Sequence, residues 1–375
     1  MTAVTQRSNG IVRQIVSADD GTGDLYVRAD VASGQTQVTN ELIRLHADGS
    51  VANHFGLGFD GHIHRIALAN TGDGALYVSG AFAHFDGQPA PHLVRLTRTG
   101  TLDPAFRFAG DFVPGGIAVA EDGSGQLYSV HSGPGPDCRR ESSAASDCGY
   151  ALHIVRLSRD GGVDSAFSTG QGFPGGFPPD ANPAWIHALL SNSNGTLTVG
   201  GSLLSYNGVG VSSLTRLNAD GTLDSTFVSR VGYSSDPVVE VIAPVGDGTR
   251  DIYIGGRIGL LRVLESGAFD TSFTAAVPLI TLSIAPVQDG TGDLYVSGLG
   301  DNRIRFLRLD PRGAVAPTFQ EPRLDGEVLT IVPLLDGTKD LYIGGAFTSY
   351  NGVAVNHTAR VHADGSLAGT LNGPS

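Results

Sequence analysis

The sequence predicts an all-β protein, a single seven-bladed β-propeller in which each blade has four antiparallel strands. Two repeated phrases and the composition lead to this prediction. The first phrase joins an acidic Gly turn to an apolar strand, as in "DGTGDLYVSG" (289–298) and "DGTRDIYIGG" (247–256). The second phrase follows each time, as in "TRLNADGTLDSTF" (215–227). The 53 Gly and 19 Pro residues are typical of a chain rich in turns.

The two phrases pair seven times along the chain. The second phrase is clear at 43–55, 94–106, 155–167 and 215–227, and weaker at 261–273, 307–319 and 359–371. Seven units in 375 residues give about 54 residues each, a period typical of propellers, solenoids and arrays. We expect one domain, 1–375, with blades at roughly 9–56, 57–107, 112–168, 184–228, 237–274, 279–320 and 326–372.

Each unit is expected to form four strands in order. The first is an apolar run such as "VLTIVPLL" (328–335), which an Asp-Gly hairpin turn joins to a second strand such as "LYIGG" (341–345). The third is "TRL" or "ARV", and the tight turn "ADG" leads to an outer strand such as "TLDSTF" (222–227). One such sheet cannot bury both of its faces, whereas sheets packed radially in a ring do so.

Two forms of ring closure are compatible with the sequence. Unit one begins at its inner strand and unit seven ends at its outer strand, so the ring can close without a shared blade. Alternatively, Thr2 to Arg7 add a strand to the last blade.

Composition limits the partners. The formal net charge is −13 and the pI about 5.1, which disfavours a nucleic-acid partner. No apolar run reaches the roughly 18 residues typical of a membrane helix. The start, "MTAVTQRSNG", has no apolar core, so we expect either that a signal was removed or that the chain is a module of a longer protein.

Three units carry a longer motif that resembles the delta-60 repeat, a family of tandem repeats in bacterial proteins. The residues are "GGAFTSYNGVAVNHTARVHADGSL" (344–367), "GGSLLSYNGVGVSSLTRLNADGTLDSTF" (200–227) and "SGAFAHFDGQPAPHLVRLTRTGTLDPAF" (79–106). The other four units lack the middle Tyr-Asn-Gly segment. The resemblance implies a propeller, often within large exported or surface proteins, and it transfers no catalytic residue.

Loop lengths differ between the two faces of the predicted ring. The hairpins between strands one and two and between strands three and four are uniformly short. The other connections vary, with long segments at 29–41, 131–153 and 168–185 and almost nothing in units five and six. Because variable loops on a rigid scaffold usually carry binding sites, we expect the functional face here, raised at blades three and four.

The predicted ligand site lies in these long loops. A sugar needs aromatic faces to stack on and polar groups to bind its hydroxyls. The expected ligand-binding residues are Phe173, Phe177, Trp185, Tyr150, His153, Arg139 and Arg140, with Glu141 beside them. Two alternatives stay open: Trp185 is core at the start of the inner strand of blade four, and the two Phe residues pack under their own loop.

The only two cysteines, Cys138 and Cys148, lie in the longest insertion. A polar loop has little else to order it, so we expect a disulfide between them. Such a bond implies an oxidising compartment, and hence an extracellular or cell-surface location.

The acidic turns resemble the calcium loops of integrin-type propeller repeats. Asp289, Gly290 and Asp293 match the later positions of that pattern, but Ala285 and Val287 stand where earlier ligands are needed. Unit one departs in the same way at Val16 and Ala18. Because calcium takes six to eight oxygen ligands, we expect hydrogen-bonded Asp turns, no cofactor and no catalytic metal.

Two further patterns have structural explanations. The Tyr-Asn-Gly segments at 206–208 and 350–352 are compatible with sugar binding, but repetition favours a turn with a packed Tyr. His62 and His64, separated by one residue, are expected to point to one side of a strand rather than to bind a metal.

The sequence contains no Gly-x-Ser-x-Gly, His-Glu-x-x-His or Gly-rich phosphate-binding motif. We therefore expect a non-catalytic, adhesin-like or lectin-like module that binds a glycan or surface polymer through the long-loop face. Two alternatives stay open. One is a protein–protein scaffold that uses this face or the low rim at blades five and six. The other is a propeller enzyme acting on polysaccharide, for which paired carboxylates in a central pocket would be the sign.

Overall fold

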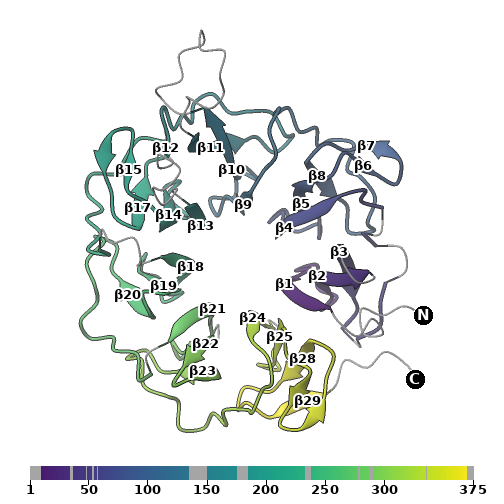
Figure 1. Cartoon of the computed structure of the whole chain (residues 1–375), viewed down its shortest axis with the longest axis vertical. Coiled ribbons are helices and arrows are strands. Elements are labelled where there is room, and N and C mark those ends of the chain that lie inside the picture. Colours follow the sequence, from purple (N-terminus) through teal and green to yellow (C-terminus); the bar gives the residue numbers. More distant parts are fainter. Residues whose placement is uncertain are drawn as a thin grey trace.

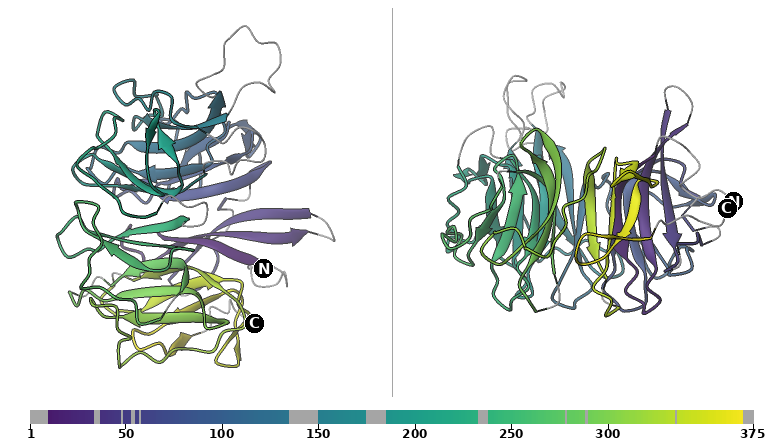
Figure 2. Two further views of the ribbon diagram at one scale, coloured as in Figure 1. Left: turned by 60° about the vertical axis from the view of Figure 1, so that its left-hand side comes forward. Right: turned by 90° about the horizontal axis from the view of Figure 1, so that it is seen from below.

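A computed structural model describes the chain at residues 10–33, 37–47, 49–52, 55–56, 58–134, 150–174, 185–232, 238–277, 279–287, 290–334 and 336–369. These residues form strands, turns and bends, and none of them is helical. Seven sheets of three or four strands follow one another around a common axis, and each holds the strands of one sequence unit (Figure 1). Seen from the side, the strands run along this axis from one face of the ring to the other (Figure 2).

The strands within each unit are antiparallel and in chain order. Units one to three contain β1 (Ile11–Ser17), β2 (Leu25–Ser33), β3 (Gln37–Leu45), β4 (His62–Leu68), β5 (Leu76–Ala81), β8 (Leu93–Leu96), β9 (Gly116–Val119), β10 (Leu127–Pro134), β11 (Tyr150–Leu157) and β12 (Phe173–Pro174). Units four to seven contain β13 (Trp185–Ser191), β14 (Leu197–Ser202), β17 (Leu214–Leu217), β18 (Val239–Pro244), β19 (Ile252–Gly256), β20 (Leu261–Val263), β21 (Ile280–Pro286), β22 (Leu294–Gly300), β23 (Arg303–Leu309), β24 (Val328–Pro333), β25 (Leu341–Gly345), β28 (Thr358–Val361) and β29 (Leu367–Gly369). Three short hairpins lie outside these sheets: β6–β7 (His84–Phe85, Gln88–Pro89), β15–β16 (Ser205–Tyr206, Val209–Gly210) and β26–β27 (Ser349–Tyr350, Val353–Ala354).

The "LYIGG"-type strand is the buried centre of each unit. In β25 all five residues are buried, because sheets of neighbouring units cover both faces of the strand. Its second glycine, Gly345, lies opposite Val328, where the pairing with β24 shifts register. A Cβ atom at Gly345 would overlap the carbonyl oxygen of Glu327, so the bulge requires glycine there.

The outer strand is shorter than the sequence suggests. In unit four it is a single bridge between Leu217 and Leu223, and five other units have one bridge at the same place. The reason lies in the following residue, Asp224, whose carboxylate accepts hydrogen bonds from the main chain and the hydroxyl of Thr226 at 2.9 and 2.6 Å. This Asx turn bends the chain away before a longer ladder forms.

The last unit packs against the first. The Tyr342 side chain belongs to the same apolar cluster as Val12 and Ile15, and its hydroxyl lies 3.4 Å from the carbonyl oxygen of Ala47. The main-chain N–H of Ile15 donates to Oγ1 of Thr330 at 3.2 Å. The segment Thr2 to Arg7, considered for closure, lies outside the described residues.

Candidate binding groove

Each short hairpin fills a space beside the segment that links its unit to the preceding unit. In unit four, Tyr206 is 1% exposed, its ring centroid lies 4.7 Å from that of Phe173, and its hydroxyl donates to the carbonyl of Gly221. The next residue, Asn207, has a φ of 49° and pairs with Gly172: its N–H donates to the Gly172 carbonyl, and its Oδ1 accepts from the Gly172 N–H, both at 3.0 Å. In the Tyr-Asn-Gly segment, the tyrosine therefore packs against the linker and the asparagine forms the turn.

The same arrangement recurs in unit seven. Tyr350 is fully buried, donates to the Gly365 carbonyl at 2.5 Å and forms a bridge with Leu324 of the linker. Asn351, with a φ of 51°, donates to the Arg323 carbonyl at 2.9 Å and accepts from the Arg323 N–H at 2.8 Å. The aromatic residue and the positive-φ residue thus act together.

Units five and six have no such hairpin. Residues 257–260 join β19 directly to β20, and β22 turns into β23 through Asp301 and Asn302. Both turn residues have positive φ, 52° and 58°, as a two-residue type I′ hairpin requires.

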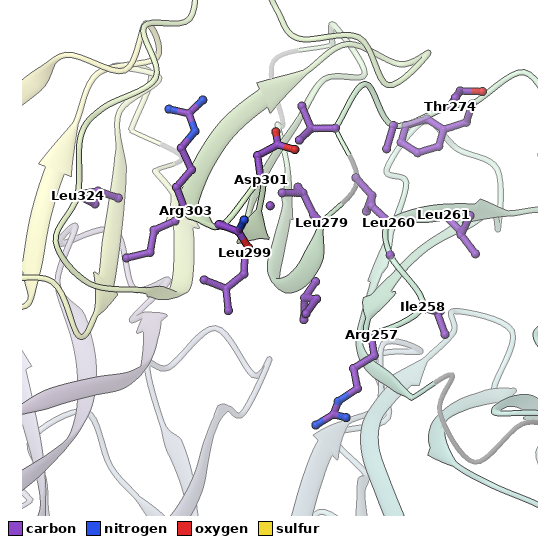
Figure 3. Close-up of a pocket in the computed structure, with 18 residues that line it drawn as sticks. Arg257, Ile258, Leu260, Leu261, Thr274, Leu279, Leu299, Asp301, Arg303 and Leu324 are labelled. Carbon is purple, nitrogen blue, oxygen red and sulfur yellow. The ribbon is translucent and has the colours of Figure 1, made fainter.

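The missing hairpins leave a groove of about 1330 Å³ between units five and six, on the face that carries the linkers. Leu260, Leu279 and Leu299 lie in its middle, with Arg257 and Arg303 on opposite sides of them (Figure 3). The lining also includes Leu261, Phe273, Ala275, Val277, Ile280, Ile304 and Leu324. Leucine, isoleucine and valine thus predominate in the lining, a composition suited to an apolar ligand surface.

Ion pairs fix one rim of this groove. The guanidinium of Arg305, whose side chain is 7% exposed, pairs with Glu321 at 2.5 Å and with Asp301 at 3.2 Å. Arg303 pairs with the same Glu321 at 3.2 Å, but 58% of its side chain is exposed. The rim therefore offers a positioned cation and, in Asp301, an exposed carboxylate.

The predicted ligand-site residues that the structure describes lie on two successive sheets: Tyr150, His153 and Phe173 in unit three, and Trp185 in unit four. Phe173, in β12, is fully buried against Tyr206, so its ring presents no surface to a ligand and takes the packing role. Trp185, the first residue of β13, is 55% exposed, so the alternative that it is core is wrong. Tyr150, the first residue of β11, pairs with Pro134. Phe177, Arg139, Arg140, Glu141, Cys138 and Cys148 lie outside the described residues, and the disulfide stays a prediction.

His153 belongs to a stack of rings. It lies opposite His131 across β10 and β11, with ring centroids 5.5 Å apart, and His131 stacks on Phe112 at 4.1 Å. Phe108 and Phe112 form an edge-to-face pair with ring centroids 5.2 Å apart. Burial lowers the pKa of His131 and so favours its neutral ring.

The acidic turns bind arginine side chains. Arg44 pairs with Asp20 at 2.7 Å and with Asp24 at 2.8 Å, and Arg262 pairs with Asp247 and Asp251 at 3.0 and 2.9 Å. The carboxylates considered as calcium ligands in unit one therefore already have a cationic partner. In the described part of the chain, no three His, Cys, Asp or Glu side chains form a group suited to a metal ion.

His64, which was expected to be a strand residue and not a metal ligand, lies in β4, and its Nδ1 atom is 3.2 Å from the carbonyl oxygen of Pro114.

The groove lies at the low rim predicted for units five and six, where a groove was not expected. The sequence signal for the groove is the absence of an aromatic-Asn-Gly segment from these two consecutive units.

The described residues contain no helix that is long and apolar enough to span a membrane.

A family profile described as "Domain of unknown function (DUF5122) beta-propeller" matches residues 71–106, 193–227 and 336–367. These segments contain the three short hairpins, and the match identifies β-propeller repeats. Comparison with curated proteins gave no match.

Solved structures are similar to the chain at low sequence identity. A puromycin hydrolase is 15% identical with a TM-score of 0.52; the alignment covers 99% of this chain and 54% of that one, so the chain spans about half its length. A glucose dehydrogenase is 15% identical, with a TM-score of 0.42 and coverage of 76% and 94%. A luciferin-regenerating enzyme is 12% identical, with a TM-score of 0.40 and coverage of 77% and 85%.

The first of these structures corrects one expectation. The lack of a hydrolase or phosphate-binding motif led to the expectation that the chain is not an enzyme. The fold that spans its whole length, however, is also found in a hydrolase. The exclusion of catalysis was wrong and is withdrawn, because a propeller carries function in loops that such motifs do not describe.

Proposed function

We propose that the chain is a recognition module whose groove between units five and six binds a segment of another protein. The observation that carries this proposal is the apolar lining of a large open groove, with Arg303 and Asp301 on its rim. Exposed apolar surface rimmed by charged groups is typical of protein-binding sites. The low rim was one of the two places considered for a protein scaffold.

The lining favours a protein segment over a sugar in this groove. Stacking on a sugar needs exposed ring faces, and the one aromatic ring in the lining, Phe273, is only 6% exposed. Aliphatic side chains such as Leu261 and Ile280 instead suit the apolar side chains of a peptide.

A glycan or surface polymer is the second candidate ligand, at a different place. The Phe112–His131–His153 stack supports it, because it combines ring faces with imidazole nitrogens beside the long connection of unit three. His153 is the predicted site residue that this candidate retains.

We also propose that the seven sheets are the blades of one closed ring, each with a fourth strand that is mostly reduced to a bridge. The units would then be repeats of the delta-60 type. The contact between Tyr342 and the first unit supports closure. An exported or cell-surface location within a larger protein remains part of this proposal.

The test is a selection of linear peptides displayed on phage against the purified chain. The informative variant is Ile280→Asp, because Ile280 lines the groove and is 44% exposed. The matched control is Val209→Asp, since Val209 is 53% exposed on β16, outside the groove. Selected peptides should bind the wild type and the control but lose at least about tenfold in affinity for Ile280→Asp. Equal binding to all three proteins, or no selected peptide, would contradict the proposal.

A further inference from the structure

We propose that the groove is an unfilled hairpin site and that it binds a tight turn of the partner in which an aromatic residue precedes Asn-Gly or Asp-Gly. This inference rests on the proposed function and names the chemistry of its partner. The chain itself shows which groups fit such a space, because three of its own units fill the equivalent space from within.

The three internal occupants share two features. Each carries an aromatic side chain that is at most 2% exposed, followed by an Asn or Asp with positive φ. The pairs are Phe85–Asp86, Tyr206–Asn207 and Tyr350–Asn351. In each case the second residue donates its N–H to a carbonyl of the preceding linker, at 2.9 to 3.0 Å. The ring provides apolar contact, and the turn fixes the hairpin to the linker.

The linker beside the groove retains the groups that such a turn needs. In unit seven the linker begins with Gln320, whose N–H donates to the main-chain carbonyl of Asp364. Three residues later, Arg323 pairs with Asn351 through both its N–H and its carbonyl. The corresponding start beside the groove is Thr274, whose N–H donates to the Arg312 carbonyl at 2.9 Å.

Three residues after Thr274 stands Val277, which lines the groove. No described residue donates to or accepts from its main chain. Val277 is thus placed after its linker start as Arg323 is in unit seven, whereas in unit four the paired Gly172 follows the linker start, Ser168, by four residues. Among the described residues, Val277 has no main-chain partner of the kind that Arg323 has. A turn entering the groove can pair with it by the same two hydrogen bonds.

The ring site differs from its equivalents in one polar group. The hydroxyls of Tyr206 and Tyr350 donate to the carbonyls of Gly221 and Gly365. The equivalent carbonyl in unit six belongs to Gly313, and it already accepts the N–H of Ala276 at 2.8 Å. Because one acceptor position of that carbonyl is taken, a ring without a hydroxyl, as unit two uses in Phe85, fits without needing it, and phenylalanine is the expected anchor.

The experiment uses a fluorescent cyclised peptide with the sequence of residues 347–355 and Phe in place of Tyr350. Binding to the full chain is measured by fluorescence polarisation, beside the same probe with Ala in place of the ring. The phenylalanine probe should bind the wild type and Val209→Asp saturably. Its affinity for Ile280→Asp, and that of the alanine probe for the wild type, should be at least about tenfold weaker. Thermal unfolding shows whether both variants are folded.

The outcomes separate this inference from the proposal on which it rests. Equal binding of the phenylalanine and alanine probes, or no binding of either, overturns the aromatic turn. If selected linear peptides still require Ile280, the groove remains a protein-binding site. If neither the cyclic probes nor any selected peptide depends on Ile280, both proposals are wrong.

Discussion

At the scale of single residues, the arginine of the third strand explains the acidic turns. In unit five, Arg262 lies 2.9 Å from Asp251, 3.0 Å from Asp247 and 3.3 Å from Asp270. Only 14% of its side chain is exposed, so these carboxylates depend on a cation that water screens poorly. The arginine thus joins the turn between strands one and two to the segment after the turn between strands three and four.

We expect Arg262→Met to reduce the free energy of unfolding by about 3 kcal/mol, because it leaves partly buried carboxylates without their cation. The same substitution at Arg250 is the control: its pair with Glu265 is about half exposed and should contribute about 0–1 kcal/mol. Urea unfolding of both variants measures the difference. Equal losses would show that the repeated arginine is no more important than a surface ion pair.

Hydrogen-bonded carboxylates and buried histidines predict how stability changes with pH. Hydrogen bonds from the His84 main chain and side chain, and then from the Ala83 N–H, lower the pKa of Asp60 to about 2. The N–H of Ala166 is the main cause of the lowered pKa of Asp164. Burial lowers the pKa values of His131 and His187. In each case the unfolded chain binds protons at a higher pH than the folded chain does.

Stability should therefore fall on acidification in two ranges. The histidine contribution is lost as the pH falls below the ordinary histidine value of 6.5, and the carboxylate contribution is lost below 3.8, towards pH 2. Urea midpoints at pH 7, 5, 4 and 3 should decline gently at first and then steeply. A midpoint that rises between pH 5 and 3 would contradict the assignment.

At the scale of elements, the second glycine of the central strand has a steric role that can be tested. We expect Gly345→Ala to destabilise the protein by about 3 kcal/mol, because its Cβ would overlap the main chain of Glu327 where β24 begins. Gly210→Ala is the control, since a Cβ there meets no atom within 4 Å; its effect should stay within about 0.5 kcal/mol. Thermal unfolding of the two variants distinguishes them, and a tolerated Gly345→Ala would rule out the steric explanation.

The elements also show what the sequence could predict. The central strands and Asp-Gly turns were predictable because both depend on local chemistry, namely apolar β-formers and glycines with positive φ. The hairpin at Tyr206 was predicted as a turn, since two residues per strand give no alternation to detect. Phe173 was assigned to a ligand because nothing in its own loop shows that Tyr206 of the next unit covers it.

The groove could not be predicted for a related reason. It arises from what units five and six lack, and its size depends on how Leu279 and Leu299 are placed by neighbouring units. A comparison between units does carry the signal, because two successive units omit a segment that three others use to fill the same space. Sequence length alone suggested a low rim and gave no indication of depth.

At the scale of the whole molecule, the proposed closed ring makes every unit depend on both neighbours. The last and first units meet through the Tyr342 cluster and through the hydrogen bond from Ile15 to Thr330. An open array of repeats can lose an end unit and keep the rest, because each repeat contacts only its neighbours along the chain. A closed ring that loses a unit exposes two apolar sheet faces at once.

Deletion of residues 326–375 separates these two architectures. In a closed ring, the truncated chain should bind a hydrophobic dye, self-associate on size-exclusion chromatography and lose cooperative urea unfolding, because Val12 and Ile15 on one side and Tyr295 and Phe306 on the other lose their cover. A point variant, Tyr342→Ala, is a milder probe of the same contact and should cost about 3–5 kcal/mol. A truncated chain that stays monomeric and unfolds cooperatively, with stability reduced by about one seventh, would show additive repeats and contradict the closed ring.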